Sequence, residues 1–339
     1  MTPLVSIITV NYNGMHDTCE MIDSFRRHET YPRYEIIVVD NGSRLPEAEE
    51  IQARYAAGYA SGSSVSGNLV AGSSASGSSV SDNLTARSSA SGSSIPGNPR
   101  VKVVRNINNG FAGGNNAGLK AAGGDYLFFI NNDTLIKEPI LATLVRRIEC
   151  NPQRTGGVSP MLKFAARPDI LQYAGFTPLS PITLRNAAIG FMQQDSPRFR
   201  VSCETASLHG AAMLVSRQAL QDAGPMTEVY FLFYEELDWS AQIRKAGYRL
   251  WYEPAAVVYH KEGMTARRGS PMREFYLSRA RVLFARRNLR GIRKYLSCAY
   301  LCLLAAPKKA AAYLLHGQAA LAKATIYGTY KGIVFTRNG

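Results

Sequence analysis

The residues most suggestive of chemistry are three carboxylates, Glu235, Glu236 and Asp238, which directly follow an aromatic run that begins at Tyr230. Three acidic side chains after so many apolar residues are not typical of a solvent-exposed face. A carboxylate in a partly apolar site has a raised pKa, which suits a general base that takes a proton from an attacking hydroxyl. This segment, with a helix beginning in it, therefore predicts acid–base chemistry.

Two further candidates lie where predicted strands end. Asp133 comes just after the apolar run at residues 125–131, and His260 ends a short run at residues 256–260. A carboxylate at the tip of a buried strand is costly unless it binds something, and Mg²⁺ or Mn²⁺ takes carboxylates together with substrate phosphate oxygens. Asp133 therefore predicts a metal–diphosphate site. A helix-capping Asp133 and a merely hydrogen-bonded His260 are the alternatives.

Polar residues also follow the runs at 4–10 and 35–40, and a glycine-rich stretch precedes a helix expected at about 114–122. Asp40 could accept from a nucleobase or a ribose hydroxyl, or be a turn residue. Glycines before a helix N-terminus allow a diphosphate to approach the backbone, although a plain loop has the same composition. The predicted donor-binding residues are Thr9, Asn11, Tyr12, Asn13, Asp40, Asn41, Asn109, Gly113, Asn115, Asn131 and Asn132.

The elements that must position these residues alternate between strands and helices. Strands are expected at 4–10, 35–40, 101–105 and 125–131, with helices at 15–28 and about 114–122, and short strands at 249–252 and 256–260. This order predicts an α/β fold with a mixed, mostly parallel sheet flanked by helices. In such sheets ligands bind beyond the carboxyl ends of the strands.

Residues 58–99 interrupt this pattern. They contain a tandem repeat of 15 residues, ASGSSVSGNLVAGSS followed by ASGSSVSDNLTARSS and part of a third unit. Its Ser, Gly and Asn composition cannot bury enough apolar surface to offset the entropy of ordering, which predicts a mobile insertion without a catalytic role. A small β-solenoid is the alternative, but so few units make a poor array.

The net charge of +14 is confined to the end of the chain. Residues 1–260 hold 23 basic and 23 acidic side chains, whereas residues 261–339 hold 16 basic and only 2 acidic ones. A neutral body with a basic tail points to an anionic membrane surface and not to nucleic acid. The five cysteines form no CxxC pair, and no signal peptide is visible, so a reducing, cytoplasmic setting is expected.

Taken together and in order, seven segments resemble family 2 glycosyltransferases, the inverting GT-A group, and most closely the bacterial rhamnosyltransferase-like members. The resemblance spans residues 4–288 apart from the repeat. The segments are VSIITVNYNG (5–14), EIIVVDNGS (35–43), NNGFAGGNNAG (108–118), YLFFINNDT (126–134), HGAAMLVSR (209–217), FLFYEELDW (231–239) and VVYHKE (257–262).

The resemblance implies a GT-A fold at residues 1–270, a nucleoside diphosphate-sugar donor, Mg²⁺ or Mn²⁺ as cofactor, and single-displacement transfer to an acceptor hydroxyl in cell-surface polysaccharide synthesis. Asp133 matches the last position of the family's metal motif, with His260 near the metal. Glu236 matches the base. The motif has Asn131 where the family has Asp, and Glu236 is one methylene longer than Asp, so Glu235 or Asp238 could share the role.

The basic region at 271–339 contains a helix expected at 271–290 and two apolar stretches, 295–306 and 310–327, separated by Pro307, Lys308 and Lys309. The first stretch is shorter than the roughly 20 residues that a bilayer requires. An interfacial anchor on the inner membrane face is therefore expected, with an ordinary helical subdomain as the alternative. A lipid-linked or glycan acceptor would suit such an anchor.

Three other functions remain open at this stage. A nucleotidyltransferase would require a basic, glycine-rich signature near the first strand, which residues 11–14 lack. A nucleic-acid-binding protein fits the isoelectric point near 9.6 but not the confinement of the charge to the tail. A catalytically silent relative of the glycosyltransferases is the third.

Overall fold

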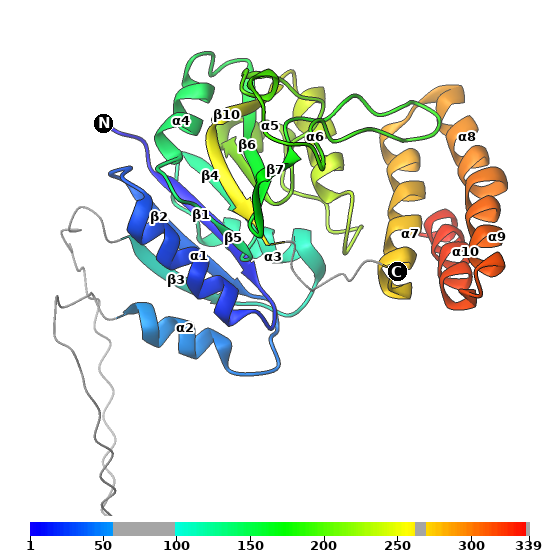
Figure 1. Ribbon diagram of the computed structural model, residues 1–339, viewed down its shortest axis with the longest axis horizontal. Coiled ribbons are helices and arrows are strands. Elements are labelled where there is room, and N and C mark those ends of the chain that lie inside the picture. The colour runs from blue at the N-terminus through cyan, green and yellow to red at the C-terminus, as the bar shows by residue number, and fades with distance from the viewer. Residues whose placement is uncertain (57–98, 262–268, 337–339) are drawn as a thin grey trace, which may run out of the picture.

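The computed structural model describes residues 1–56, 99–261 and 269–336, which form an α/β domain joined to a group of C-terminal helices (Figure 1). The repeat predicted as an insertion at 58–99 lies outside the described residues except for Pro99.

One mixed sheet organises the domain, with the strand order β3-β2-β1-β4-β9-β6-β10-β5. β3, β2, β1 and β4 run parallel to one another, β9 is antiparallel between β4 and β6, and β10 is parallel to β6. The strands are β1 Val5–Asn11, β2 Tyr34–Asp40, β3 Arg100–Arg105, β4 Tyr126–Ile130, β5 Thr134–Leu135, β6 Thr155–Phe164, β7 Arg167–Tyr173, β8 Cys203–Glu204, β9 Ala212–Ser216 and β10 Arg249–His260. The predicted α/β class with a mostly parallel sheet is confirmed.

Helices cover both faces of this sheet (Figure 1). Alternate residues of each strand enter different cores: Ile7 packs in one apolar cluster with Phe25 of α1, and Ile8 in another with Trp239 of α6. Continuous apolar runs are what strands buried on both faces require. The helices are α1 Met15–His28, α2 Glu47–Ala56, α3 Gly110–Ala121, α4 Leu141–Glu149, α5 Arg217–Ala223, α6 Glu235–Lys245, α7 Pro271–Asn288, α8 Gly291–Ala299, α9 Ala306–Leu315 and α10 Ala319–Val334.

The glycine-rich stretch is helical and not a loop, so the predicted start of this helix was wrong. α3 begins at Gly110, which has a φ of +87° that favours glycine. Later glycines let the helix lie close to the sheet: a Cβ on Gly118 would lie 2.5 Å from Cγ2 of Ile8 and 2.9 Å from Cγ2 of Val39. Helix–sheet packing therefore accounts for glycines that the sequence alone associates with a diphosphate.

β10 also differs from its prediction as two short strands. It is one strand of 12 residues, with a change of register against β6 between Glu253 and Val257. Such an irregularity lets a strand continue past Pro254 without pairing every residue. The consequence is that His260 lies at the end of a long strand, beside Thr134 of β5.

The C-terminal helices form a separate layer beside the sheet, in which α7 packs on α10 (Figure 1). Pro307 does not separate two apolar helices as predicted, because the chain is helical from Gly291 to Leu315. A π-helical stretch, Tyr300–Ala305, precedes α9, and its wider turns relieve the clash that a proline causes in a helix. The helical path ends instead near Gly317, which has a φ of +70°.

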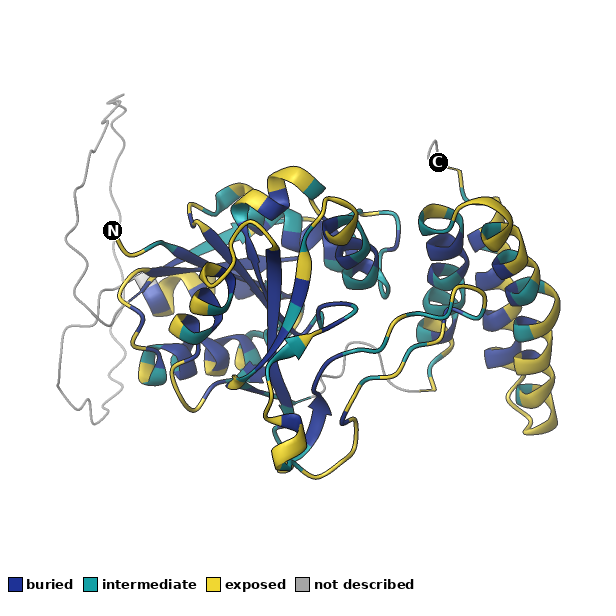
Figure 2. Cartoon of the chain, turned by 90° about the horizontal axis from the view of Figure 1, so that it is seen from above, coloured by how far each residue is buried: buried dark blue, intermediate teal, exposed yellow. Residues whose placement is uncertain are grey.

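A hairpin-like arm, residues 176–188, reaches from the sheet domain to these helices (Figures 1 and 2). Its two limbs are joined by the bridge between Phe176 and Ala188. The carbonyl of Ile182 accepts a hydrogen bond from the Ser297 hydroxyl at 2.7 Å, and that of Thr183 accepts one from Arg281 at 2.5 Å. The arm therefore ties α7 and α8 to the domain.

Replacing Gly118 by alanine should lower the free energy of unfolding by about 1–3 kcal/mol, because the new methyl group overlaps β1 and β2. Gly123→Ala is the matched control, since its Cβ would lie 3.5 Å from the Glu35 carboxylate, an ordinary contact. Urea unfolding of both variants tests this. A Gly118→Ala protein as stable as the wild type would contradict the close-packing account.

Candidate active site

The parallel register places the polar ends of β1 and β2 opposite each other, with Asn11 beside Asp40. The Asn11 amide donates to Asp40 Oδ1 at 3.1 Å and to Glu47 Oε2 at 2.7 Å, and its oxygen accepts from the Thr18 hydroxyl at 2.7 Å. Asn132, just beyond β4, donates to the same Thr18 hydroxyl at 3.0 Å. One hydrogen-bonded network therefore spans the carboxyl ends of β2, β1 and β4.

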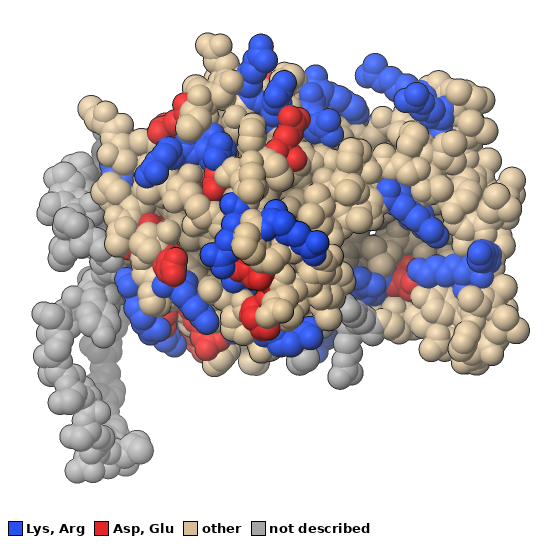
Figure 3. Space-filling model, turned by 45° about the horizontal axis from the view of Figure 1, so that its top comes forward, with Lys and Arg blue, Asp and Glu red and all other residues tan. Residues whose placement is uncertain are grey.

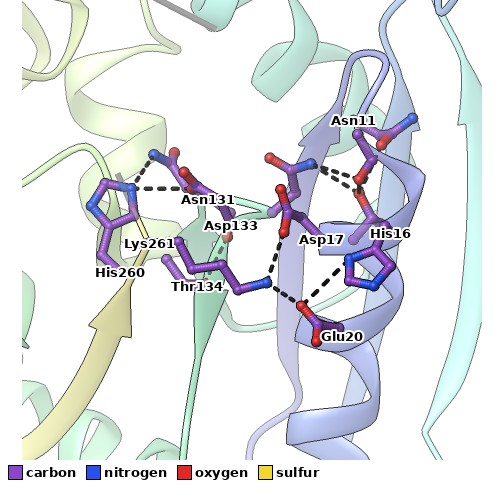
Figure 4. A network of polar contacts seen from close by, with 12 residues as sticks. Asn11, His16, Asp17, Glu20, Asn131, Asp133, Thr134, His260 and Lys261 are labelled. Atoms are coloured by element: carbon purple, nitrogen blue, oxygen red, sulfur yellow. Dashed lines mark hydrogen bonds and ion pairs between the residues drawn. The ribbon is translucent and has the colours of Figure 1, made fainter. Parts of the chain in front are cut away.

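Asp133 and His260 lie together at the other end of this edge (Figure 4). Their Oδ1 and Nε2 atoms are 3.1 Å apart, and Asn131 Nδ2 is 3.4 Å from the same Nε2. On the far side of the ring, Nδ1 lies 2.8 Å from Gln172 Oε1 on β7. Asp133 and His260 are both buried. The structure thus brings together the two residues that the sequence predicted as metal ligands.

The donor set at this point fits a divalent cation. When Nδ1–H donates to Gln172 Oε1, the lone pair of His260 Nε2 faces Asp133, an orientation common for a metal-binding histidine. A carboxylate oxygen and an imidazole nitrogen suit Mn²⁺, and substrate phosphates complete the coordination of such ions. Gln172 gave no signal in the sequence, because it is one polar residue on an otherwise ordinary strand.

A second group of potential ligands lies nearby on α1, formed by His16, Asp17 and Glu20. The ammonium of Lys261, the residue after His260, lies 2.7 Å from Asp17 Oδ1 and also pairs with Glu20 (Figure 4). The two carboxylates share the single positive charge of this lysine. The contact instead joins the end of β10 to α1 and fixes the chain next to His260.

Glu236, the predicted base, is connected to the same edge through the chain segment before β9. Its side chain lies against Gly210, where an added Cβ would be 3.5 Å from Glu236 Cγ. One residue on, the Ala211 carbonyl accepts a hydrogen bond of 2.9 Å from the Asn131 backbone. Burial raises the pKa of the Glu236 carboxyl. The segment Gly210–Ala211 therefore connects the base candidate to the end of β4.

Glu235 and Asp238 occupy different surroundings from Glu236. Glu235 is buried, its Oε1 atom has no hydrogen-bond partner among the described residues, and burial together with the charge of Glu236 raises its pKa. Asp238 accepts hydrogen bonds from Tyr230 at 2.7 Å, Asn288 at 2.6 Å and Arg287 at 3.1 Å. Arg287 and Asn288 belong to α7, so these hydrogen bonds tie Asp238 to that helix.

The loop before α6 has a strained backbone. Phe231, Phe233 and Tyr234 have φ values of +69°, +69° and +73°, a region that bulky residues rarely adopt. The Phe231 carbonyl accepts a 2.9 Å hydrogen bond from the Phe111 amide at the start of α3. Strained non-glycine residues cluster at sites whose geometry is held by the surrounding structure, and the last of these residues, Tyr234, directly precedes Glu235 at the start of α6.

His209 is a site residue that the sequence did not identify, although it lies in one of the seven segments. Its ring stacks on Phe176 at 5.7 Å, and its Nδ1 accepts a hydrogen bond of 3.1 Å from the Ala211 amide. Burial, with a smaller contribution from the nearby His260 ring, lowers the pKa of His209 to about 3. His209 is therefore neutral, with Nε2 carrying the proton, next to the segment that Glu236 contacts.

The remaining predicted donor-binding residues differ in how accessible they are. Asp40 keeps its Oδ2 atom without a partner among the described residues, whereas the Asn41 side chain bonds Asn106 and the Gly110 carbonyl. Asn115 is buried and donates to Phe111 within α3. Thr9 is buried, and in the described part of the chain its Oγ1 has no hydrogen-bond partner. Tyr12 is half-buried, Asn13 is exposed and accepts from the Arg44 amide, and Asn109 lies over Gly113. Their binding roles stay predictions.

Glu235→Gln should make stability less dependent on pH. A carboxyl with a raised folded pKa binds more protons folded than unfolded, so stability falls as pH rises from about 4.5, its usual value, through the folded pKa. The variant should melt above the wild type at about pH 8 and close to it at about pH 4. Exposed Glu138→Gln is the control, and an equal difference at both pH values would contradict the raised pKa.

Solved structures with this fold were found at low identity. The mannosyltransferase PcManGT from Pyrobaculum calidifontis, in complex with GDP-Man and Mn²⁺, has a TM-score of 0.56 and 16% identity, over 98% of this chain and 88% of that one. The structure of GalNAc-T7 with UDP, GalNAc and Mn²⁺ has a TM-score of 0.56 and 15% identity, and the match covers 92% of this chain and 58% of GalNAc-T7. The structure of S. aureus TarS has a TM-score of 0.50 and 14% identity, and the match covers 89% of this chain and 43% of TarS. These likenesses confirm the expected fold.

The sequence itself matches the family model described as Glycosyl transferase family 2, over residues 6–65 and 80–221. The two ranges cover more than half of the chain and leave out residues 66–79, which lie within the repeat. No curated protein matches. The chain belongs to glycosyl transferase family 2.

Proposed function

We propose that the protein transfers a sugar from a nucleoside diphosphate-sugar to a hydroxyl of a glycan or lipid-linked acceptor, with inversion, in cell-surface polysaccharide synthesis. One observation carries this proposal. Asp133 lies just after the end of β4 and contacts His260. Glu236 contacts Gly210, and the neighbouring Ala211 is hydrogen-bonded to Asn131 at the same end of β4. An in-line displacement requires the leaving diphosphate and the attacking hydroxyl on opposite sides of one carbon. At this edge, Asp133 and His260 would serve the diphosphate and Glu236 would serve the hydroxyl.

The nucleoside would lie over β1 and β2, where Asp40 has an oxygen that can accept from a base or a ribose hydroxyl. GDP-Man and UDP accompany the similar mannosyltransferase and GalNAc-T7 structures, and both also contain Mn²⁺. dTDP-rhamnose is our first candidate donor, from the resemblance to rhamnosyltransferases, and a UDP-sugar is the second. The network from Asp40 through Asn11 and Thr18 to Asn132 would hold this surface rigid.

Asp133 and His260 would hold Mg²⁺ or Mn²⁺, and Asn131 lies where its amide can contact the same ligand sphere. When bound, the cation neutralises the charge that develops on the departing diphosphate. Gln172 fixes the His260 ring so that Nε2 faces the ligand. The exchange of Asp for Asn at position 131 leaves one fewer negative charge, so metal affinity would depend mainly on Asp133.

Glu236 would take the proton from the acceptor hydroxyl. Its half-buried position raises its pKa toward that of an efficient base, while Gly210 leaves room beside its carboxylate. Glu235, the neighbouring acidic side chain, would influence the basicity of Glu236 through its charge. Asp238 would position α6 against α7 through its four hydrogen bonds, to Tyr230, Gln242, Arg287 and Asn288.

We further propose that the enzyme works on the cytoplasmic face of the membrane. Among the described residues, one helix, Gly291–Leu315, is long and apolar enough to cross a bilayer, and only 17% of its most apolar window is buried. Exposed apolar side chains on this helix include Ile292, Leu303 and Leu315. Lys308 and Lys309 lie well inside it, which is costly in a bilayer core and suits a helix lying in the interface.

The test is release of nucleoside diphosphate from a panel of nucleoside diphosphate-sugars, with and without Mn²⁺, in the presence of acceptor. Metal-dependent release from one donor is expected. Glu236→Gln should lower kcat by about 10²–10⁴-fold while donor binding, measured by calorimetry, stays intact. Glu138→Gln, at an exposed glutamate that follows β5, is the control. Full activity of Glu236→Gln would assign the base elsewhere, and no donor binding at all would contradict the proposed function.

A further inference from the structure

The loop before α6, residues 229–234, leads directly into Glu235 and Glu236. Three of its residues have positive φ values although none of them is glycine, so contacts from outside must hold the loop in this shape. Figure 3 shows a hollow between the sheet domain and the C-terminal helices, so these two parts do not touch over their whole height. At the loop, however, α7 lies directly against the domain.

Arg279 of α7 forms two hydrogen bonds to the start of this loop. Its Nη1 atom donates to the Tyr230 carbonyl at 2.8 Å, and its Nη2 atom donates to the Val229 carbonyl at 3.0 Å. The acceptors belong to successive residues, and the fixed fork of a guanidinium group can satisfy both at once. Arg279 is half-buried, which limits the competition of water for these carbonyls. Arg279 therefore fixes the direction in which the backbone enters the loop.

Two further residues of α7 contact aromatic side chains of the loop. The Tyr276 ring stacks on that of Phe231, with 5.0 Å between the ring centroids and 22° between the planes. The Arg273 guanidinium lies 5.4 Å from the centroid of the Phe233 ring, within the range of a cation–π contact. Arg273, Tyr276 and Arg279 follow one another at intervals of three residues, so one side of α7 runs along the loop.

The loop also contacts the start of α3. The Phe231 carbonyl accepts a hydrogen bond of 2.9 Å from the Phe111 amide. Gly110 permits this approach, because a Cβ at that position would overlap the backbone of Phe231. Phe231 is thus held through its carbonyl by α3 and through its ring by Tyr276 of α7. Five residues later, Glu236 lies in the first turn of α6.

We propose that α7, through Arg279 and Tyr276, holds the loop before α6 in the shape that orients Glu236 toward the acceptor hydroxyl. The assignment rests on the proposed glycosyl transfer, which it deepens by naming positioning residues for the base. Neither residue needs to touch the substrate, because both act through the backbone that leads into α6. The C-terminal helices thus contribute to the chemistry, in addition to the membrane contact proposed above.

Arg286 offers a matched control on the same helix. It is also half-buried, and it donates to two carbonyls, those of Gly332 at 2.7 Å and Phe335 at 2.9 Å. These acceptors lie at the end of α10 and not in the loop before α6. Arg279 contacts Phe335 as well, with its guanidinium 4.8 Å from the ring centroid. Arg279→Met and Arg286→Met therefore both remove contacts with this end of the chain, and only the first also releases the loop.

The first experiment compares turnover with donor binding. Arg279→Met should lower kcat by about 10- to 100-fold, because a displaced base loses its alignment with the hydroxyl, while the affinity and stoichiometry of donor binding in calorimetry stay those of the wild type. Tyr276→Leu should lower kcat in the same direction without removing a charge. Arg286→Met should keep the kcat of the wild type. An equal loss of kcat in both arginine variants would show a purely structural role and overturn the proposal, as would full activity of Arg279→Met.

Hydrogen exchange of the backbone amides, followed by mass spectrometry without substrates, tests directly whether α7 holds the loop. Peptides that span residues 229–238 should exchange at least about tenfold faster in Arg279→Met than in the wild type, since two hydrogen bonds that oppose local opening are lost. Arg286→Met should leave these peptides unchanged. Unchanged exchange in Arg279→Met would overturn the proposal, and so would faster exchange with an unaltered kcat.

The exchange measurement also separates the role of α7 from the proposed function. A wild-type protein that binds no nucleoside diphosphate-sugar would reject glycosyl transfer, and the exchange rates would still decide whether α7 holds the loop. A wild type that turns over donor, together with an Arg279→Met variant whose loop exchanges at the normal rate, would keep glycosyl transfer and reject the positioning role of α7.

Discussion

The parallel pairing of β2, β1 and β4 is the constraint on which the site depends. Because these strands run in the same direction, their polar carboxyl ends lie together at one edge of the sheet. Asn11 lies opposite Asp40 in the hydrogen-bonded register. A shift of one residue would exchange the faces of every strand and bury these polar groups in the apolar cores. The apolar packing of Ile7 and Ile8 on opposite faces therefore also fixes the chemistry at the edge.

The second half of the sheet, from β9 to β10, supplies the remaining residues of the site. β9 enters between β4 and β6, and the residues before it place Gly210 and Ala211 between Asn131 and Glu236. β10 brings His260 back to Asp133 from a position 127 residues later in the chain. Lys261 then ties this strand end to α1. Groups far apart in sequence thus form one site.

Local patterns in the sequence were enough for the α/β order and for most strand ends, because apolar runs followed by polar residues mark where buried strands reach solvent. The resemblance to family 2 glycosyltransferases also predicted that Asp133 and His260 lie near one metal. Local patterns failed for the glycines of α3, where long-range packing against Ile8 decides, and for Pro307, where a local change to a π-helical stretch lets the helix continue. Gln172 was missed since its only distinguishing property is a contact with His260.

The central claim is that the carboxyl edge of the sheet binds a metal and a nucleoside diphosphate together, at Asp133 and not at the acidic group on α1. Electron paramagnetic resonance of Mn²⁺ titrated with protein, with and without dTDP or UDP, tests it most directly. The account predicts that the nucleotide tightens Mn²⁺ binding, that Asp133→Asn abolishes this effect and that Asp17→Asn preserves it. Coupled binding that survives in Asp133→Asn but is lost in Asp17→Asn would contradict the account.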